Sequence, residues 1–378
     1  MSPSFRNACL LLTAGTLAAC SPEEVNIKIG VALPLSGPIA QFGKDGVNGA
    51  QIAVDELNSD RKFTINGKHP TITLVPMDDK SDPETGKQVA QALIAQKVSA
   101  VYGDLNSGVT IPASALYAQA GIPQISPSTN PLYTRQGFKT TFRILADDYM
   151  QGAAIVTLLT EKLHAKSIYV VDDGSPFGTG LADEVSKDLT AKTITAPHDR
   201  VNPQNPDYAT LMQKIKDSKA DVVFFGGDEG SGLPVIKEIR KADPTIKIVT
   251  GDALCDVSTI KHAGGIIDSN YFCTIAGIPT SWQFGGNLFT RMYKDKYGTP
   301  GAFSIPAYDA IHILTQAMKK ANSSDPAVYL PFMTKGPYDG KIQGTVDFDS
   351  KGDLKDGTVV TYQAIGGKLS DDPNLIGP

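Results

Sequence analysis

Three polar residues follow strand-like segments at positions where they could contact a small molecule. Ser107 and Thr129 stand in loops that lead into a helix or a turn, and Asp252 stands at the end of a strand in the second half of the chain. Hydroxyl groups and helix N-terminal amides donate to carboxylates, whereas a carboxylate accepts from an ammonium group. Together these residues could hold a zwitterion, although each of them alone could equally be a helix cap.

The sequence offers little for catalysis or for metal binding. Its five histidines are dispersed, and no Cys-x-x-Cys or His-x-x-x-His spacing occurs. Gly178 and Gly180 follow a strand and open a helix, but Asp183 stands where a dinucleotide-binding motif has its third glycine. We therefore interpret these glycines as turn residues. With no Gly-x-Ser-x-Gly or Walker motif either, the pattern favours a protein without cofactor or metal, and a hydrolytic enzyme is the less favoured alternative.

The N-terminus has the pattern of an export signal. It contains one cation, Arg6, an apolar run over residues 8–14, and then Leu-Ala-Ala followed by Cys20. The apolar run is too short to span a bilayer. The last four residues resemble the lipobox of bacterial lipoproteins, which implies a signal peptide at 1–19, a lipidated Cys20 that anchors the chain to a membrane, and a tether over 20–25. The alternative is an ordinary cleavage site with a chance cysteine.

Two cysteines remain free to pair after export and lipidation. Cys9 leaves with the signal and Cys20 carries lipid, so Cys255 and Cys273 are left in an oxidising compartment. We expect a disulfide between them, and two buried free thiols are the alternative.

The composition is that of an ordinary globular protein of weakly acidic charge. Of the 378 residues, 41% are hydrophobic and 20% are charged, with 35 lysines and arginines against 40 acids. No basic run of the kind that follows a phosphate backbone occurs, so nucleic acid is not an expected partner.

After the tether the chain alternates strand-like and helix-like stretches, which is typical of α/β architecture with parallel sheets. Asp82 and Pro83 supply an N-cap and a first-turn proline for a helix through residue 95. About five strand units precede Asp147 and about five follow it, which favours two lobes over one sheet. The expected strands are 26–33, 71–75, 100–103, 122–125, 167–172, 221–225 and 246–250.

Five longer segments resemble, in order, the type I periplasmic binding proteins for leucine, isoleucine and valine. They are LSGPIAQFG at 35–43, DLNSGVTIPAS at 104–114, ISPSTNP at 125–131, GFKTTFR at 137–143 and GDALC at 251–255. The resemblance implies an α/β fold of two lobes, each a mostly parallel sheet flanked by helices, with three hinge crossings. It places one lobe at 25–146 and 276–357 and the other at 147–275 and 358–378. Ligand would lie between the lobes and hinge closure would trap it.

The resemblance also implies a ligand set. Ser107 and Thr129 match residues that bind the ligand carboxylate, the backbone carbonyl of Ser128 and the acid at Asp252 match partners of the ammonium, and aromatic walls match Phe42, Phe177 and Phe303.

Two departures affect this ligand set. Relatives commonly have one more residue between Ser128 and Thr129, so the donor loop can differ in shape. Relatives also often carry an aromatic or apolar residue where this chain has Asp228. Asp228 could face solvent or cap a helix expected to start near Leu233. If it faces the cleft, a polar or cationic ligand fits better.

These features predict the solute receptor of an ABC importer. We expect it to bind a small amino acid, of which a branched-chain one is most favoured, and to deliver it to a permease with its ATPases. The expected location is the periplasm or outer cell surface, and the expected state is a monomer. The alternative is a sensing module for a polar or cationic amino acid or amide that signals to a separate receptor.

Overall fold

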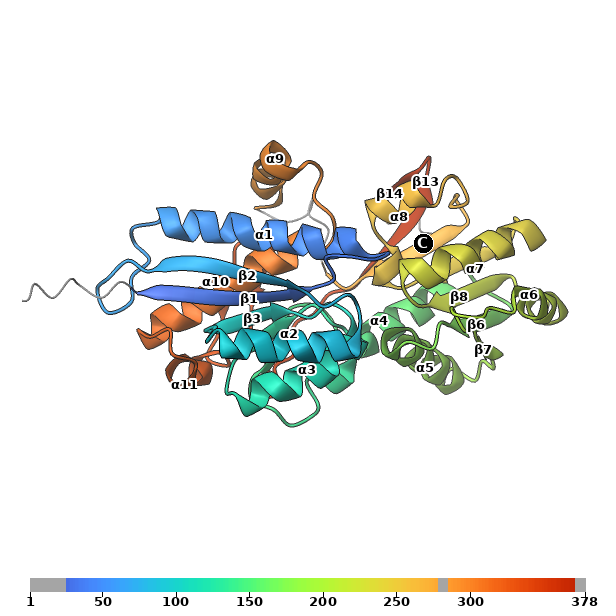
Figure 1. Ribbon diagram of the computed structural model, residues 1–378. Helices are drawn as coiled ribbons and strands as arrows, with labels where there is room; N and C mark the ends of the chain where they lie inside the picture. The colour runs from blue at the N-terminus through green and yellow to red at the C-terminus, as the bar shows by residue number, and fades with distance from the viewer. Residues whose placement is uncertain (1–24, 278–284, 371–378) are drawn as a thin grey trace, which may run out of the picture.

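A computed structural model of the protein describes residues 25–277 and 285–370 (Figure 1). Its strands are β1 (Asn26–Leu33), β2 (Thr71–Asp78), β3 (Ala100–Gly103), β4 (Gln124–Ser126), β5 (Thr141–Arg143), β6 (Ile168–Asp172), β7 (His198–Arg200), β8 (Val222–Gly226), β9 (Lys247–Thr250), β10 (Tyr271–Ile275), β11 (Tyr338–Gly340), β12 (Gly344–Val346), β13 (Val360–Ile365) and β14 (Lys368–Ser370). Its α-helices are α1 (Ala40–Ser59), α2 (Pro83–Ala95), α3 (Ser107–Gln119), α4 (Asp148–Thr157), α5 (Pro176–Ala191), α6 (Tyr208–Asp217), α7 (Glu229–Ala242), α8 (Val257–His262), α9 (Gly286–Tyr297), α10 (Ser304–Ala321) and α11 (Pro326–Tyr329). Short 3-10 or π turns lie at Pro131–Tyr133, Leu158–Lys162, Asp252–Leu254 and Leu330–Phe332.

The first lobe is built on a parallel sheet in the order β2-β1-β3-β4-β5. One face of β1 packs Ile27, Ile29 and Val31 against α1 and α10, and the opposite face of the sheet packs against α2 and α3. Gly49 allows α1 to lie close to α10, because a Cβ there would stand 2.0 Å from the Ser304 carbonyl oxygen.

The second lobe is built on a mixed sheet in the order β14-β13-β10-β9-β8-β6-β7. Strands β6 to β10 are parallel where they pair, whereas β13 runs antiparallel to β10 and β14 antiparallel to β13. Helices α4 and α5 cover one face, and α6 and α7 cover the other. Figure 1 shows the two sheets end to end, each between its own helices.

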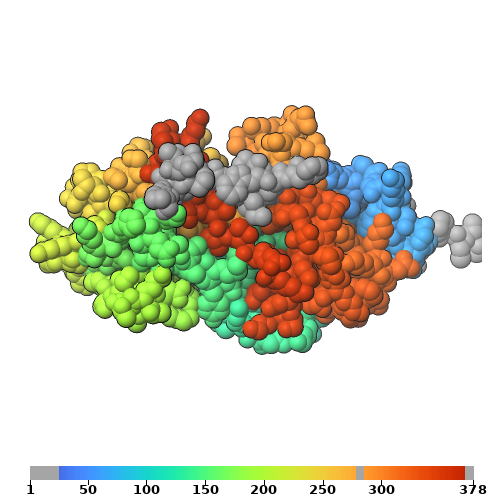
Figure 2. All heavy atoms as spheres, turned by 180° about the vertical axis from the view of Figure 1, so that it is seen from behind, coloured from blue at the N-terminus to red at the C-terminus, as the bar shows by residue number. Residues whose placement is uncertain are grey.

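The chain passes between the lobes more than once. It leaves the first sheet after β5 and returns after β10, where α9, α10 and α11 pack in the first lobe. It then rejoins the second sheet through β13. Seen from behind, the late part of the chain, in red, runs across the middle of the molecule (Figure 2). The two-lobed α/β fold predicted above is therefore confirmed, while the residue limits of each lobe stay a prediction.

None of the helices in the described part of the chain combines the length and apolar character that a bilayer crossing requires. The expected signal at 1–19 and the lipidated Cys20 lie outside the described residues.

Candidate functional site

A cavity of about 220 Å³ lies between the two lobes. Most of its walls come from the segments that follow β1, β2, β3 and β4 in the first lobe and β6, β8 and β9 in the second. These loops meet because a parallel sheet presents the carboxyl ends of its strands at one edge. All eight ligand-binding residues proposed from the sequence line this cavity. The full lining consists of Ile39, Phe42, Ser81, Pro83, Leu105, Asn106, Ser107, Gly108, Val109, Pro127, Ser128, Thr129, Ser175, Pro176, Phe177, Asp228, Asp252, Ala253 and Phe303.

The first lobe presents neutral hydrogen-bond donors. Ser107 is the first residue of α3, and its hydroxyl lies 2.9 Å from the Ser128 hydroxyl. The N-cap residue Asn106 makes no side-chain cap, and its carbonyl accepts from the amides of Val109 and Thr110, so the amides of Ser107 and Gly108 are the ones that the helix itself does not satisfy. Free amides at the N-terminus of a helix attract anions. This corner of the cavity is therefore suited to a carboxylate.

The Ser128 carbonyl has a partner that the sequence did not reveal. The fully buried guanidinium of Arg143 donates to it, and Arg143 also donates to Asp353, at 2.9 Å from its Nε. An ammonium at the same carbonyl would lie beside a guanidinium. The contact therefore favours the hydroxyl of Ser128 over its carbonyl as a ligand contact.

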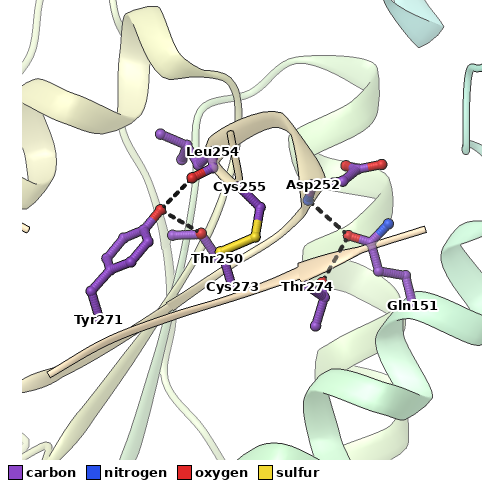
Figure 3. The surroundings of a disulfide bond; sticks show 8 residues. All are labelled: Gln151, Thr250, Asp252, Leu254, Cys255, Tyr271, Cys273 and Thr274. Atoms are coloured by element: carbon purple, nitrogen blue, oxygen red, sulfur yellow. Dashed lines mark hydrogen bonds between the residues drawn. A yellow bond between two sulfur atoms is a disulfide. The ribbon is translucent and has the colours of Figure 1, made fainter. Parts of the chain in front are cut away.

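The second lobe presents a carboxylate, Asp252, in the short turn after β9. The residue is only 8% exposed, and burial raises its pKa to about 6. The backbone amide of Asp252 donates to Gln151 of α4, at 3.1 Å, and Gln151 also accepts from Thr274. Figure 3 shows the carboxylate directed away from the disulfide that follows it.

Cys255 and Cys273 form that disulfide, as the sequence predicted. The bond ties the turn that carries Asp252 to β10, and the Tyr271 hydroxyl adds a hydrogen bond to the Leu254 carbonyl at 2.7 Å. The turn is thus tied to β10 through Leu254 and Cys255, so the backbone that carries Asp252 is held without a ligand.

Asp148 is a second buried acid behind the cavity. Its amide donates to the Thr129 carbonyl at 2.9 Å, and the residue is fully buried. Burial raises the pKa of Asp148 to about 8, and the charge of Asp252 adds to the rise while the Thr129 hydroxyl opposes it. At neutral pH Asp148 is therefore mostly protonated and adds little charge to the cleft.

Asp228 both caps a helix and faces the cavity. The helix, α7, begins at Glu229, so the expected start near Leu233 is wrong. Asp228 Oδ1 accepts from the amide of Ser231, at 3.1 Å, and desolvation raises the pKa of this acid. Gly230 and Pro234 in the first turns suggest a loop, but the cap and the buried apolar face of α7 stabilise the helix from its first residue.

Aromatic rings close the cavity at its sides. Phe42 and Phe303 of the first lobe pack against each other with ring centroids 5.3 Å apart. Phe177 lines the cavity from the second lobe and lies in the first turn of α5. Pro176 at the first helical position favours the start of the helix there.

Comparison with known proteins identifies the family. A family model described as periplasmic binding protein matches residues 26–368. The chain belongs to this family of periplasmic binding proteins. The family that the sequence motifs suggested is thereby confirmed.

This periplasmic binding protein is similar to named relatives over nearly its whole length. The Leu/Ile/Val-binding protein homolog 1 of Brucella abortus is 33% identical over 356 residues, 93% of each chain. An amino acid binding protein of Pseudomonas aeruginosa is 30% identical over 363 residues, which cover 95% of this chain and 96% of that one. The branched-chain amino acid transporter substrate binding protein of Streptococcus pneumoniae, solved in complex with isoleucine, is 27% identical with a TM-score of 0.80, and the match covers 91% of this chain and 98% of that one.

In this periplasmic binding protein the lobes touch each other directly around the cavity. Asn130 Nδ2 of the first lobe donates to the Pro176 carbonyl at 2.9 Å, and the amide of Ala302 donates to Asp256 at 2.9 Å. Gln41 Nε2 reaches Glu229 at 3.5 Å. These contacts require the two lobes to be drawn together, so the conformation is a closed one.

The described residues contain no group of three or more histidine, cysteine, aspartate or glutamate side chains placed to hold a metal ion. Sequence reasoning missed several cavity residues, among them Ser81 and Ala253. Ala253 directly follows Asp252 and could have been included with it. Ser81 follows β2 in a turn of positive φ, and no local pattern marks that turn as part of the cleft.

Proposed function

We propose that this protein is the extracytoplasmic receptor of an ABC importer and binds an α-amino acid between its lobes. One observation carries the proposal: the cavity between the lobes has neutral donors at the N-terminus of α3 on one side and the buried carboxylate of Asp252 on the other. A carboxylate suits the first side and an ammonium suits the second. The zwitterionic head of an amino acid supplies both groups at once.

Binding and closure are coupled in this proposal. The carboxylate engages Ser107 and Thr129 on the first lobe, and the second lobe then closes so that Asp252 reaches the ammonium. The ligand stabilises the closed state because it gains contacts there that the open state lacks. A permease would recognise the closed form.

The relatives support this role and suggest one kind of side chain. Their names refer to leucine, isoleucine and valine, and one structure holds isoleucine. Phe42, Phe177 and Phe303 would suit an aliphatic side chain. Asp228 lines the same cavity and does not suit an aliphatic side chain.

We also propose that the receptor is a monomer. A lipid on Cys20 would anchor it to a membrane, in the periplasm or at the outer cell surface, near its permease and ATPases. The position of Cys20 after an apolar run and two alanines supports the anchor.

A thermal-shift panel of amino acids, polyamines, amides and sugars tests the proposed function. A ligand present at about 100 times its Kd should stabilise the protein by about 2.7 kcal/mol, so an amino acid should give the largest shift. Ser107→Ala should weaken that ligand by roughly 10- to 150-fold, the effect of one hydrogen bond to a charged group. Ser114→Ala is the matched control, because Ser114 lies on α3 outside the cavity lining. A panel in which only sugars or polyamines stabilise the protein would refute the amino-acid site.

A further inference from the structure

The charged residues that line the cavity are all acids. The residues that line it include two acids, Asp228 and Asp252, and none of them is a lysine, arginine or histidine. Asp173, behind Asp228, is a third acid and is 6% exposed. Within residues 25–277 and 285–370, none of these three carboxylates forms an ion pair with a basic side chain.

The hydrogen-bond partners of Asp228 are all neutral. Oδ1 accepts from the amide of Ser231 at 3.1 Å and from its hydroxyl at 3.3 Å. The amide of Gly230 also donates to this carboxylate, and none of these donors carries a charge. Asp173 fixes the backbone of Asp228, because its Oδ2 accepts from the Asp228 amide at 3.2 Å and from the Ser231 hydroxyl at 2.7 Å.

An amino acid with an aliphatic side chain would leave this carboxylate unmatched. Its ammonium would neutralise Asp252 and its own carboxylate would lie on neutral donors, so the zwitterion brings no net charge. Asp228, which is half-buried in this conformation, would keep the neutral donors of Ser231 but face no cation, and a desolvated charge without an opposite charge is costly. A second cation would give Asp228 a charge-assisted hydrogen bond. Phe177 and Phe303 line the same cavity, and an aromatic ring whose face meets a cation attracts it.

We infer that the bound amino acid carries a positive charge on its side chain, as lysine, ornithine and arginine do, and that Asp228 selects it. This inference rests on the proposed function, since it needs Asp252 to take the α-ammonium. It differs from the leucine, isoleucine and valine in the names of the relatives. Asp228 is thus a specificity-determining residue as well as a helix cap.

The experiment compares L-lysine with L-norleucine, which has the same straight carbon chain without the terminal ammonium. Isothermal titration calorimetry at about pH 7.5 would measure both ligands, with L-ornithine, L-arginine and L-leucine, on the wild type, Asp228→Asn and Asp207→Asn. Asparagine caps a helix as well as aspartate does, so Asp228→Asn should fold. Asp207→Asn is the matched control, because Asp207 caps α6 through the same contact, to the amide of Thr210, away from the cavity.

The wild type should bind at least one of the three cationic amino acids more tightly than L-leucine and L-norleucine. Asp228→Asn should weaken that ligand by roughly 30-fold or more and change L-norleucine by less than about 3-fold, while Asp207→Asn changes neither. Tighter binding of L-leucine than of every cationic ligand would overturn the inference and leave the proposed function intact. A cation preference that survives in Asp228→Asn would overturn the role of Asp228. Binding of no amino acid at all would refute the proposed function and this inference together.

Discussion

Replacing Asp252 with asparagine should separate ligand binding from fold stability. The amide side chain would keep the shape of the carboxylate but remove the charge that we assign to the ligand ammonium. Because Asp252 is 8% exposed and its pKa is raised to about 6, its carboxylate is mostly ionised at about pH 7.5 and poorly hydrated. Loss of one member of a buried charged pair costs about 2–5 kcal/mol, so Kd should rise by roughly 30-fold to several thousand-fold.

The same change should not weaken the fold. The pKa of Asp252 is about 6 in the folded protein and about 4 in the unfolded chain. Between these two pH values the unfolded chain loses the proton first, so the free energy of unfolding falls as the pH rises. Asparagine does not ionise, so Asp252→Asn removes this loss of stability. It should raise the free energy of unfolding at about pH 7.5 by up to about 3 kcal/mol. Calorimetric titration with the best amino acid and urea unfolding of both proteins measure the two effects. Full affinity in a folded Asp252→Asn protein would refute the site as drawn.

The remaining predictions concern pH, the disulfide and the anchor. Affinity should fall by about tenfold between about pH 7 and pH 5, because protonation of Asp252, whose pKa is about 6, removes the partner of the ammonium; a flat titration profile over this range would contradict it. Replacing Cys255 and Cys273 by serine should lower the free energy of unfolding by about 3 kcal/mol, as measured in urea, since the bridge closes a loop of sequence separation 18; an unchanged unfolding midpoint would speak against this. Cys20→Ser should release the protein from membranes into the soluble fraction, and a wild-type protein found wholly in the aqueous phase after detergent partitioning would rule out the anchor.

Local patterns predicted the elements well where each segment carries its own signal. Strand β1 runs over Asn26–Leu33 as expected, and α2 begins at Pro83 because Asp82 caps it through the amide of Thr85. The predicted start of α7 was wrong, since Gly230 and Pro234 disfavour a helix and it takes both the Asp228 cap and the packing of α7 in the second lobe to outweigh them.

The site was predictable in its outline but not in its support. The motifs pointed to Ser107, Thr129 and Asp252, which line the cavity. Arg143 and its partner Asp353 are 210 positions apart in the sequence, and only the fold brings them together beneath Ser128. No spacing rule links residues so distant.

The most direct test of the central claim is a crystal structure of the protein with the amino acid that stabilises it most. We expect the ligand ammonium within hydrogen-bonding distance of the Asp252 carboxylate, and the ligand carboxylate at the Ser107 hydroxyl and the first amides of α3. A ligand bound elsewhere, or one whose carboxylate points toward Asp252, would contradict the proposed function.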